Sequence, residues 1–371
     1  MRVADSDGFN VVKQPWSLGR RIAAASAVFL GIGFIVFAAA GGNAEGRLVG
    51  AGSTLANPIL QRVSTSYQGY LAADRVDLTR QEGQSGDWAG GSGALDSDPV
   101  GSVGGLVRLG DPTVTFAVTE VPVAAEDLAA QGKLQFPLIL GAVAPVANLD
   151  LGGEALVLDA ATLAKIYKGE ITNWSDPAIS TLNTGVSLPD QAIAVRYRRD
   201  GSGSTWTFTG YLSRASDWST GQVAQTAWLV GEGADGSRGL IEAVKAVPGA
   251  IGYSEVGQAR RAGLSVIRLV NGSGMVESPS AATIRAAASA AKWEAGQQIA
   301  SVSASAGWPM TATVYVVMRA DDRQNDRALA FFRYFYAEAA RQADALGYVP
   351  LPQDVVTEIE AYWAAIISKQ S

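Results

Sequence analysis

The residues that could carry chemistry are glycines and hydroxyl side chains at three places where a strand pattern leads into a helix pattern. They are Gly52-Ser53-Thr54, Gly101-Ser102 and Gly201-Ser202-Gly203-Ser204. The first N–H groups of a helix have no partner within the helix, and glycine allows a ligand to approach the backbone closely. Each segment alone is typical of a helix cap, but three with the same chemistry favour an anion-binding site.

Arg198 supplies the charge that these neutral donors lack. Its planar guanidinium suits two oxygens of a tetrahedral oxyanion. Asp200 follows two residues later, on the same side of an extended chain, and is expected to hold Arg198 by a salt bridge. We expect the arginine to be solvated in a cleft and to contribute little to stability. The alternative is an ordinary surface arginine.

The absence of certain residue types limits the kinds of catalysis and metal binding that are possible. The 371 residues include no cysteine and no histidine, which excludes disulfides, thiolate nucleophiles, imidazole bases and ordinary zinc sites. The glycine loop after Arg198 lacks the lysine of a P-loop and the third glycine of a dinucleotide-binding fingerprint. No carboxylates have the spacing of metal ligands. We therefore expect no cofactor, no metal site and no catalytic residues.

Charge and hydropathy separate the first 44 residues from the rest. Residues 22–44 carry no charge and follow Arg20 and Arg21. This pattern indicates either a cleaved secretory signal peptide or an uncleaved membrane anchor. Both alternatives place the remainder outside the cytoplasm, in the periplasm, and only the anchor brings membrane contact. The net charge is −6 for the whole chain and −8 without this segment, with no basic stripe, so nucleic acid is not an expected partner.

Alternating strand and helix patterns must position these residues. The apolar run "FPLILGAVAPVANL" (136–149) is expected to be a buried parallel strand. Asp159 and Gly169 bound an expected helix, and "AIAVRYRR" (192–199) is expected to be the strand that leads to Arg198. In a chain of this length the alternation predicts an α/β fold with mostly parallel sheets and two lobes.

Eight segments carry a resemblance to a known family. In the family's order they are "GAGSTLANP" (50–58), "GSVGG" (101–105), "FAVTEVP" (116–122), "LAKIYKGEITNWSDPAI" (163–179), "RRDGSGSTWTFTGYLS" (198–213), "PGAIGYSE" (248–255), "WP" (308–309) and "LGYVPLP" (346–352). With them the chain resembles the phosphate-binding proteins that serve as the periplasmic component of phosphate ABC transporters. The resemblance implies a type II solute-binding fold with two α/β lobes joined by two crossing hinge strands. It also implies a receptor that closes on inorganic phosphate and delivers it to permease subunits, without acting as an enzyme.

Position by position, the resemblance implies which residues contact phosphate. The expected donors are Thr54, the Leu55 amide, Ser102, Arg198, Ser202, the Gly203 amide and Ser204, with Asp200 orienting Arg198. Glu120 stands where the family has an aspartate that accepts a hydrogen bond from the proton of phosphate. Its additional methylene leaves anion selectivity open, including phosphate against arsenate. Ser85 and Ser92 are alternatives to Ser102, because the stretch 83–100 is longer than in the family.

The lobes are expected to divide the exported part of the chain. Lobe one comprises 47–139 and 252–371 and lobe two 140–251, with crossings near "LILGAV" (138–143) and "AIGYSE" (250–255). We expect a monomer. Two alternative functions are left open. One is a protein with the receptor fold but altered anion selectivity or lost ligand binding, and the other is a phosphate-ester hydrolase that uses the same anion-binding residues.

Overall fold

The computed structural model describes residues 48–76, 95–215, 218–289, 293–295 and 305–367. The chain divides into two compact units, 1–43 and 44–371, and the second contains all of these residues. The predicted signal peptide or anchor (1–44) lies outside the described residues, as do Ser85 and Ser92. No helix in the described part of the chain is both long and apolar enough to cross a membrane.

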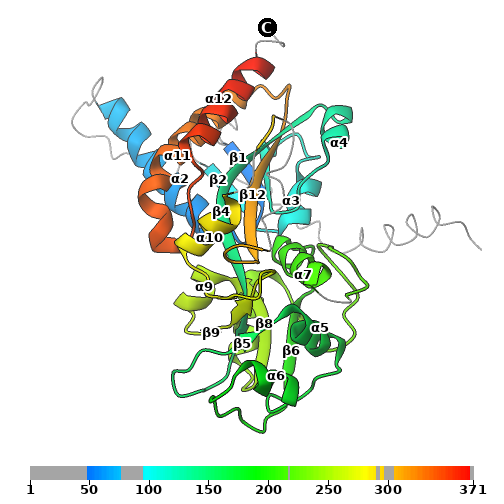
Figure 1. The fold of residues 1–371 in the computed structure, drawn as a ribbon. Coiled ribbons are helices and arrows are strands. Elements are labelled where there is room, and N and C mark those ends of the chain that lie inside the picture. Colours follow the sequence, from blue (N-terminus) through cyan, green and yellow to red (C-terminus); the bar gives the residue numbers. More distant parts are fainter. Residues whose placement is uncertain (1–47, 77–94, 216–217, 290–292, 296–304, 368–371) are drawn as a thin grey trace, which may run out of the picture. The chain divides into compact units, whose positions relative to one another are not determined.

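The strands form one large mixed sheet and one small sheet (Figure 1). The order in the large sheet is β2-β1-β3-β12-β4-β8-β6-β7, and β9 pairs with β4. These strands are β1 (Leu48–Gly52), β2 (Leu95–Asp98), β3 (Phe116–Thr119), β4 (Lys133–Ala147), β6 (Ala194–Arg198), β7 (Glu232–Ala234), β8 (Ala250–Glu255), β9 (Ser265–Val266) and β12 (Thr311–Arg319). The small sheet has the order β11-β10-β5, with β5 (Val157–Leu158), β10 (Arg268–Val270) and β11 (Val276–Glu277).

The long strand β4 links two groups of strands. The first group is β1, β2, β3 and β12, and the second group is β6, β7, β8 and β9. Its residues Lys133–Ala142 pair with β12, and Val143–Ala147 pair with β8, antiparallel in both cases. All of β4 except Lys133 is buried, which accounts for its apolar sequence. The predictions of a parallel strand here and of mostly parallel sheets are wrong, because burial on both faces gives a continuous apolar run whichever way the neighbouring strands point.

Helices cover both groups of strands (Figure 1). They are α2 (Asn57–Val76), α3 (Ser102–Arg108), α4 (Ala125–Ala130), α5 (Ala160–Lys168), α6 (Pro177–Leu182), α7 (Gly203–Ala215), α8 (Gly236–Lys245), α9 (Val256–Arg261), α10 (Ala281–Ala288), α11 (Asn325–Leu346) and α12 (Gln353–Ile367). The alternation of these helices with the strands confirms the predicted α/β class. Helix α5 begins and ends as predicted, because Asp159 accepts from the amide of Thr162 (2.7 Å) and Gly169 has a φ of 79°.

Aromatic side chains fill the core between the first group of strands and the C-terminal helices. Phe332 of α11 packs edge-on against Phe116 of β3 and Phe136 of β4, with ring centroids 5.1 and 5.4 Å apart. Trp363 of α12 lies 4.9 Å from the ring of Phe136. These large buried rings hold β3 in place, and β3 leads directly into the candidate site.

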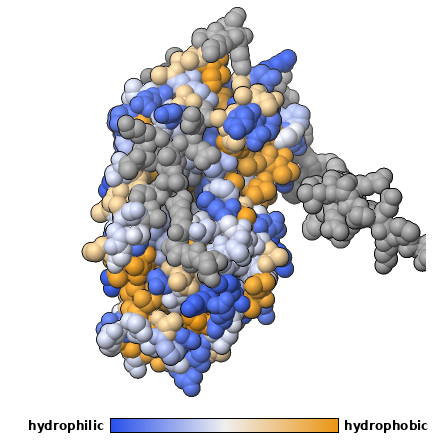
Figure 2. Space-filling model, turned by 45° about the vertical axis from the view of Figure 1, so that its right-hand side comes forward, coloured by the Kyte–Doolittle hydropathy of each residue, from blue (hydrophilic) through white to orange (hydrophobic). Residues whose placement is uncertain are grey.

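The surface mixes hydrophilic and hydrophobic residues, as Figure 2 shows for one face. Large exposed apolar side chains among the described residues are Tyr70, Val107, Leu229, Met275 and Val276. They come from α2, α3, β11 and loops. Single exposed apolar residues are normal on a protein surface.

Candidate anion site

The three glycine and hydroxyl segments lie at the ends of strands and the starts of helices. Ser53 and Thr54 follow β1 and precede α2. Ser102 is the first residue of α3, and Gly203 is the first residue of α7, five residues after the end of β6. Each segment therefore lies at or just before the start of a helix, where backbone amides lack partners within the helix.

Backbone hydrogen bonds tie these segments to one another. The amide of Gly101 donates to the carbonyl of Gly52 (2.9 Å), and the amide of Val103 donates to the carbonyl of Gly201 (3.3 Å). Gly52 and Gly101 have φ values of 135° and 84°, which residues with side chains rarely adopt. The structure thus brings together segments that lie about 50 to 150 positions apart in the sequence.

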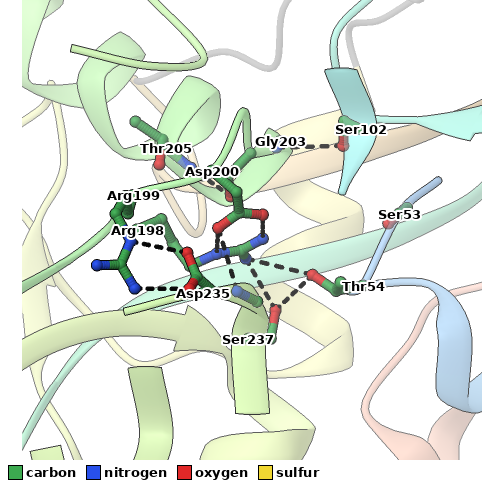
Figure 3. A network of polar contacts seen from close by, with 12 residues as sticks. Ser53, Thr54, Ser102, Arg198, Arg199, Asp200, Gly203, Thr205, Asp235 and Ser237 are labelled. Carbon is green, nitrogen blue, oxygen red and sulfur yellow. Dashed lines mark hydrogen bonds and ion pairs between the residues drawn. The ribbon is translucent and has the colours of Figure 1, made fainter. Parts of the chain in front are cut away.

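Arg198, the last residue of β6, lies where the segments meet (Figure 3). Its Nε donates to Oδ1 of Asp200 at 2.6 Å, and its Nη2 pairs with Oδ2, which confirms the predicted salt bridge. Its Nη1 donates to the hydroxyls of Thr54 (3.2 Å) and Ser237 (3.1 Å). The side chain is only 1% exposed, so the expectation of a solvated arginine is wrong. Thr54, which follows β1, and Ser237, near the start of α8, contact the guanidinium in the folded chain.

The neighbouring Arg199 has the opposite environment. Its side chain is 64% exposed, and it pairs with Asp235, which is 67% exposed. Figure 3 shows Arg199 directed toward Asp235, while Arg198 is directed toward Asp200, Thr54 and Ser237. Arg199 directly follows β6, and the two adjacent arginines are separated because successive side chains of an extended chain point to opposite sides.

Ser237 is a site residue that the sequence analysis missed. It lies near the start of α8, is buried, and its Oγ is 2.8 Å from Oγ1 of Thr54 as well as within reach of Arg198. The amide of Gly236 donates to Asp200 Oδ1 (3.1 Å). A signal was present in the sequence, because Gly236-Ser237 has the same glycine and hydroxyl pattern at a helix start as the other three segments.

Glu120 directly follows β3, and its carboxylate is buried among hydroxyl groups. Ser53 Oγ donates to Oε1, and Ser102 Oγ donates to Oε2 at 2.5 Å. The amide of Gly203 in turn donates to Ser102 Oγ (3.1 Å). Burial raises the pKa of Glu120, and the hydrogen bonds from Ser102 and Ser53 and the charge of Arg198 act in the opposite direction.

The other predicted donors differ in their surroundings. Ser202 Oγ accepts from the amide of Thr205 (3.3 Å) and so caps α7. Ser204 Oγ is buried and has no hydrogen-bond partner in the described part of the chain. The carbonyl of Leu55 accepts from the hydroxyl of Tyr348 (2.6 Å), and the Leu55 side chain is buried. That any of these groups contacts phosphate stays a prediction.

Tyr253 of β8 contacts the backbone of Arg198. Its hydroxyl accepts from the amide of Arg198 (3.1 Å) and is 2.8 Å from Oγ1 of Thr205. The Tyr253 ring stacks on Phe208 of α7, with centroids 4.4 Å apart. Burial raises the pKa of Tyr253 to about 12, so the hydroxyl stays neutral and can both donate and accept.

Comparison with known proteins places the chain in a family. Residues 38–339 match the family described as "PBP superfamily domain". The phosphate-binding protein PstS of Xylella fastidiosa (strain 9a5c) is 33% identical over 330 residues, which covers 86% of this chain and 85% of that protein. PstS of Pasteurella multocida (strain Pm70) is 33% identical over 327 residues, covering 85% and 89%. The chain belongs to the PstS family of the PBP superfamily.

Solved structures share the fold of this PstS-family chain. The periplasmic phosphate-binding protein PfluDING, bound with phosphate, has a TM-score of 0.63 at 22% identity, covering 85% of this chain and 93% of that one. A human phosphate binding apolipoprotein has a TM-score of 0.62 at 21% identity, with the same coverage. Together with the family match, these similarities confirm the predicted two-lobed binding-protein fold.

A second buried carboxylate of this PstS-family chain, Glu255, is linked to the site through Gln258. It ends β8, and it accepts from the amides of Gly257 (2.5 Å) and Gln258 (2.7 Å) at the start of α9. The Gln258 side chain donates to the carbonyl of Thr54 (3.0 Å). Burial raises the pKa of Glu255 to about 7, and the two amides and Arg261 oppose this shift.

Glu255→Gln should remove a pH dependence of stability. The pKa of Glu255 in the folded protein is about 7, above its ordinary value of 4.5. Its contribution to the free energy of unfolding is therefore fully present below pH 4.5 and is lost as the pH rises through 7. The loss amounts to about 3 kcal/mol. Urea denaturation of both proteins gives their free energies of unfolding. The value for Glu255→Gln minus the value for the wild type should increase by about this amount between pH 4.5 and pH 8. Glu126→Gln, at an exposed position, is the control, and a constant difference for Glu255→Gln would contradict the prediction.

Proposed function

We propose that the chain is an extracytoplasmic receptor that binds inorganic phosphate between its two lobes and delivers it to an ABC permease, without performing chemistry. The observation that carries the proposal is the buried Arg198, oriented by Asp200 where Thr54, Ser102 and Gly203 come together. A buried guanidinium surrounded by hydroxyls and helix-start amides suits a small tetrahedral anion. The PstS relatives are named as phosphate-binding proteins, which supports phosphate as that anion.

The phosphate contacts in this proposal follow the family's pattern. The donors are the side chains of Thr54, Ser102, Arg198, Ser202 and Ser204 and the amides of Leu55 and Gly203. Ser204 supports this set because its buried hydroxyl is not committed to another described group. Glu120 is the acceptor for the proton of hydrogen phosphate. Sulfate has no such proton at neutral pH, so its oxygens and the carboxylate would repel each other in a dry site.

Closure of two lobes about their crossings is part of the proposal. The pairing of β4 supports the first crossing, at Ala142–Val143. For the second we favour Trp308–Thr311 over the predicted 250–255. Strands β8 and β9 pair with the second half of β4, whereas β12 pairs with the first half. Trp308 also donates to the carbonyl of Val143 (2.8 Å). The division into lobe one (47–139 and 252–371) and lobe two (140–251) stays a prediction. The strand pairing favours a second boundary near 308–311 in place of the one near 251.

Location and partners follow from the family in this proposal. The chain acts in the periplasm as a monomer, and membrane contact through the N-terminal segment arises only where that segment is uncleaved. The net negative charge of the part after residue 44 disfavours direct binding to anionic lipid. The alternative of altered anion selectivity rests on Glu120 and is decided by the same measurements.

Phosphate should raise the unfolding temperature of the full chain, whereas sulfate should not. A ligand bound only by the folded state stabilises it by about 4 kcal/mol at 1,000 times its dissociation constant. For a protein of this size we expect a rise of several degrees, measured by scanning calorimetry at constant ionic strength. Titration calorimetry with phosphate, arsenate and sulfate gives the selectivity. The absence of a shift at saturating phosphate would contradict the receptor function, and an equal shift with sulfate would support altered selectivity.

A further inference from the structure

Two hydroxyls beside the candidate anion site are already bonded to the protein's own carboxylate. Ser102, one of the expected phosphate donors, donates to Oε2 of Glu120 at 2.5 Å, and Ser53 donates to Oε1. Both serines and Glu120 are buried, with exposed fractions of 1 to 4%. A hydroxyl has one proton to donate, so Ser102 cannot donate to phosphate and to Glu120 at the same time.

The carboxylate also takes space at the start of α7. A Cβ placed on Gly203 would overlap Oε2 of Glu120 and would lie 2.6 Å from Ser102 Oγ. Oε2 therefore lies directly against the first residue of a 13-residue helix, where the partial positive charge of the helix favours an anion. Ser204, the next residue of the helix, has a buried hydroxyl with no partner among the described atoms. The carboxylate thus uses part of the surroundings that suit a small anion.

We propose that Glu120 is an intramolecular competitor for the anion site: Ser53 holds its carboxylate against the Ser102 hydroxyl until phosphate displaces it, and the displaced carboxylate then accepts the phosphate proton. The inference rests on the proposed function and adds two roles to it. Glu120 limits the affinity for phosphate, and Ser53 is a positioning residue that acts through Glu120.

The length of the glutamate side chain is what makes the competition possible. An aspartate at this position would reach less far by more than about 1 Å. Its oxygen would then lie well beyond the usual 2.5–3.0 Å hydrogen-bond distance from Ser102. Aspartate would still present an acceptor to a protonated anion. The shorter side chain therefore removes the competitor and keeps the acceptor.

Titration calorimetry of the full-length wild type and of Glu120→Asp with inorganic phosphate tests the inference. We expect Glu120→Asp to bind phosphate at least about 10-fold more tightly, because a charge-assisted hydrogen bond no longer has to be broken. Glu126→Asp, at an exposed position of α4, should leave the affinity unchanged. Far-UV circular dichroism and the unfolding temperature without phosphate establish that each variant is folded.

Ser53→Ala provides a second variant. It removes one of the two hydroxyls that hold Glu120, together with the hydrogen bond from the amide of Ala56 (2.9 Å). We expect phosphate to bind a few-fold more tightly, since the carboxylate leaves Ser102 more readily. This variant decides the question where Glu120→Asp does not fold.

The outcomes separate the inference from the function on which it rests. Tighter binding by Glu120→Asp, or binding by Glu120→Asp where the wild type shows none, supports the competitor role. Equal or weaker binding by Glu120→Asp and by Ser53→Ala, with the wild type binding phosphate, overturns that role and leaves the receptor function intact. A failure of the wild type and of both variants to bind phosphate overturns the receptor function and the inference together.

Discussion

Arg198→Ala is expected to abolish phosphate binding, whereas Arg199→Ala, one residue away, is expected to leave it unchanged. Arg198 is buried and lies within hydrogen-bond reach of Thr54 and Ser237, while Arg199 is largely exposed and pairs with Asp235. Removal of one partner of a buried charge pair costs about 2–5 kcal/mol, which corresponds to a loss of affinity of at least about 30-fold. Titration calorimetry with phosphate on the two variants measures the difference.

Stability must be followed beside affinity, because Arg198→Ala leaves Asp200 without its ion pair. The destabilisation should be smaller than the about 3–5 kcal/mol typical of a fully buried pair, because the Asp200 side chain is 24% exposed. Arg198→Lys keeps the charge but not the fork that pairs with both oxygens of Asp200, so it should remain more stable and still bind phosphate much more weakly. Full binding by a folded Arg198→Ala or Arg198→Lys protein would show that the anion is held elsewhere.

Gly203→Ala is expected to weaken phosphate binding by at least about 100-fold. The added methyl group would overlap the Glu120 carboxylate and would come within 2.6 Å of Ser102 Oγ. In a close-packed interior there is no free volume to absorb such an overlap, so the methyl group displaces the carboxylate and takes the place of the anion. The dissociation constant for phosphate, measured by titration calorimetry, tests this expectation.

Gly239→Ala is the matched control. Gly239 lies within α8, and a Cβ there would meet nothing closer than the Cβ of Ala234 at 4.0 Å. Replacement of a helical glycine by alanine stabilises a helix by up to about 1 kcal/mol, so this variant should be folded and should bind phosphate as the wild type does. Unchanged binding by Gly203→Ala would mean that phosphate does not approach the start of α7.

Much of the fold follows from patterns that are local in the sequence. The alternation of strands and helices predicts the α/β class, and the resemblance in eight segments implied the family and the two-lobed fold that the comparisons confirm. Asp159 and Gly169 bound α5 as predicted. The pairing direction of β4 was predicted wrongly, because an apolar run reports burial and not the direction of the neighbouring strands.

The candidate site was predicted in its parts but not in its connections. Glycine with a hydroxyl residue at a helix start is a local pattern, and it marked three of the segments that meet. Ser237 belongs to a fourth segment with the same pattern and was missed. Its importance arises from contacts with Thr54 and Arg198, which are 183 and 39 positions away. Nothing in the spacing of residues around Ser237 encodes those distances.

Residue types set the chemistry that is available: glycines that permit unusual backbone angles, hydroxyls and amides that donate, Arg198 with Asp200 two residues later, and no cysteine or histidine. That Arg198 is buried while Arg199 is exposed, and that the Glu120 carboxylate accepts from Ser53 and Ser102, follows only from the folded arrangement of the chain. Propensities and caps act between neighbours in the chain, whereas burial and hydrogen-bond competition depend on which distant segments the folded sheet brings into contact.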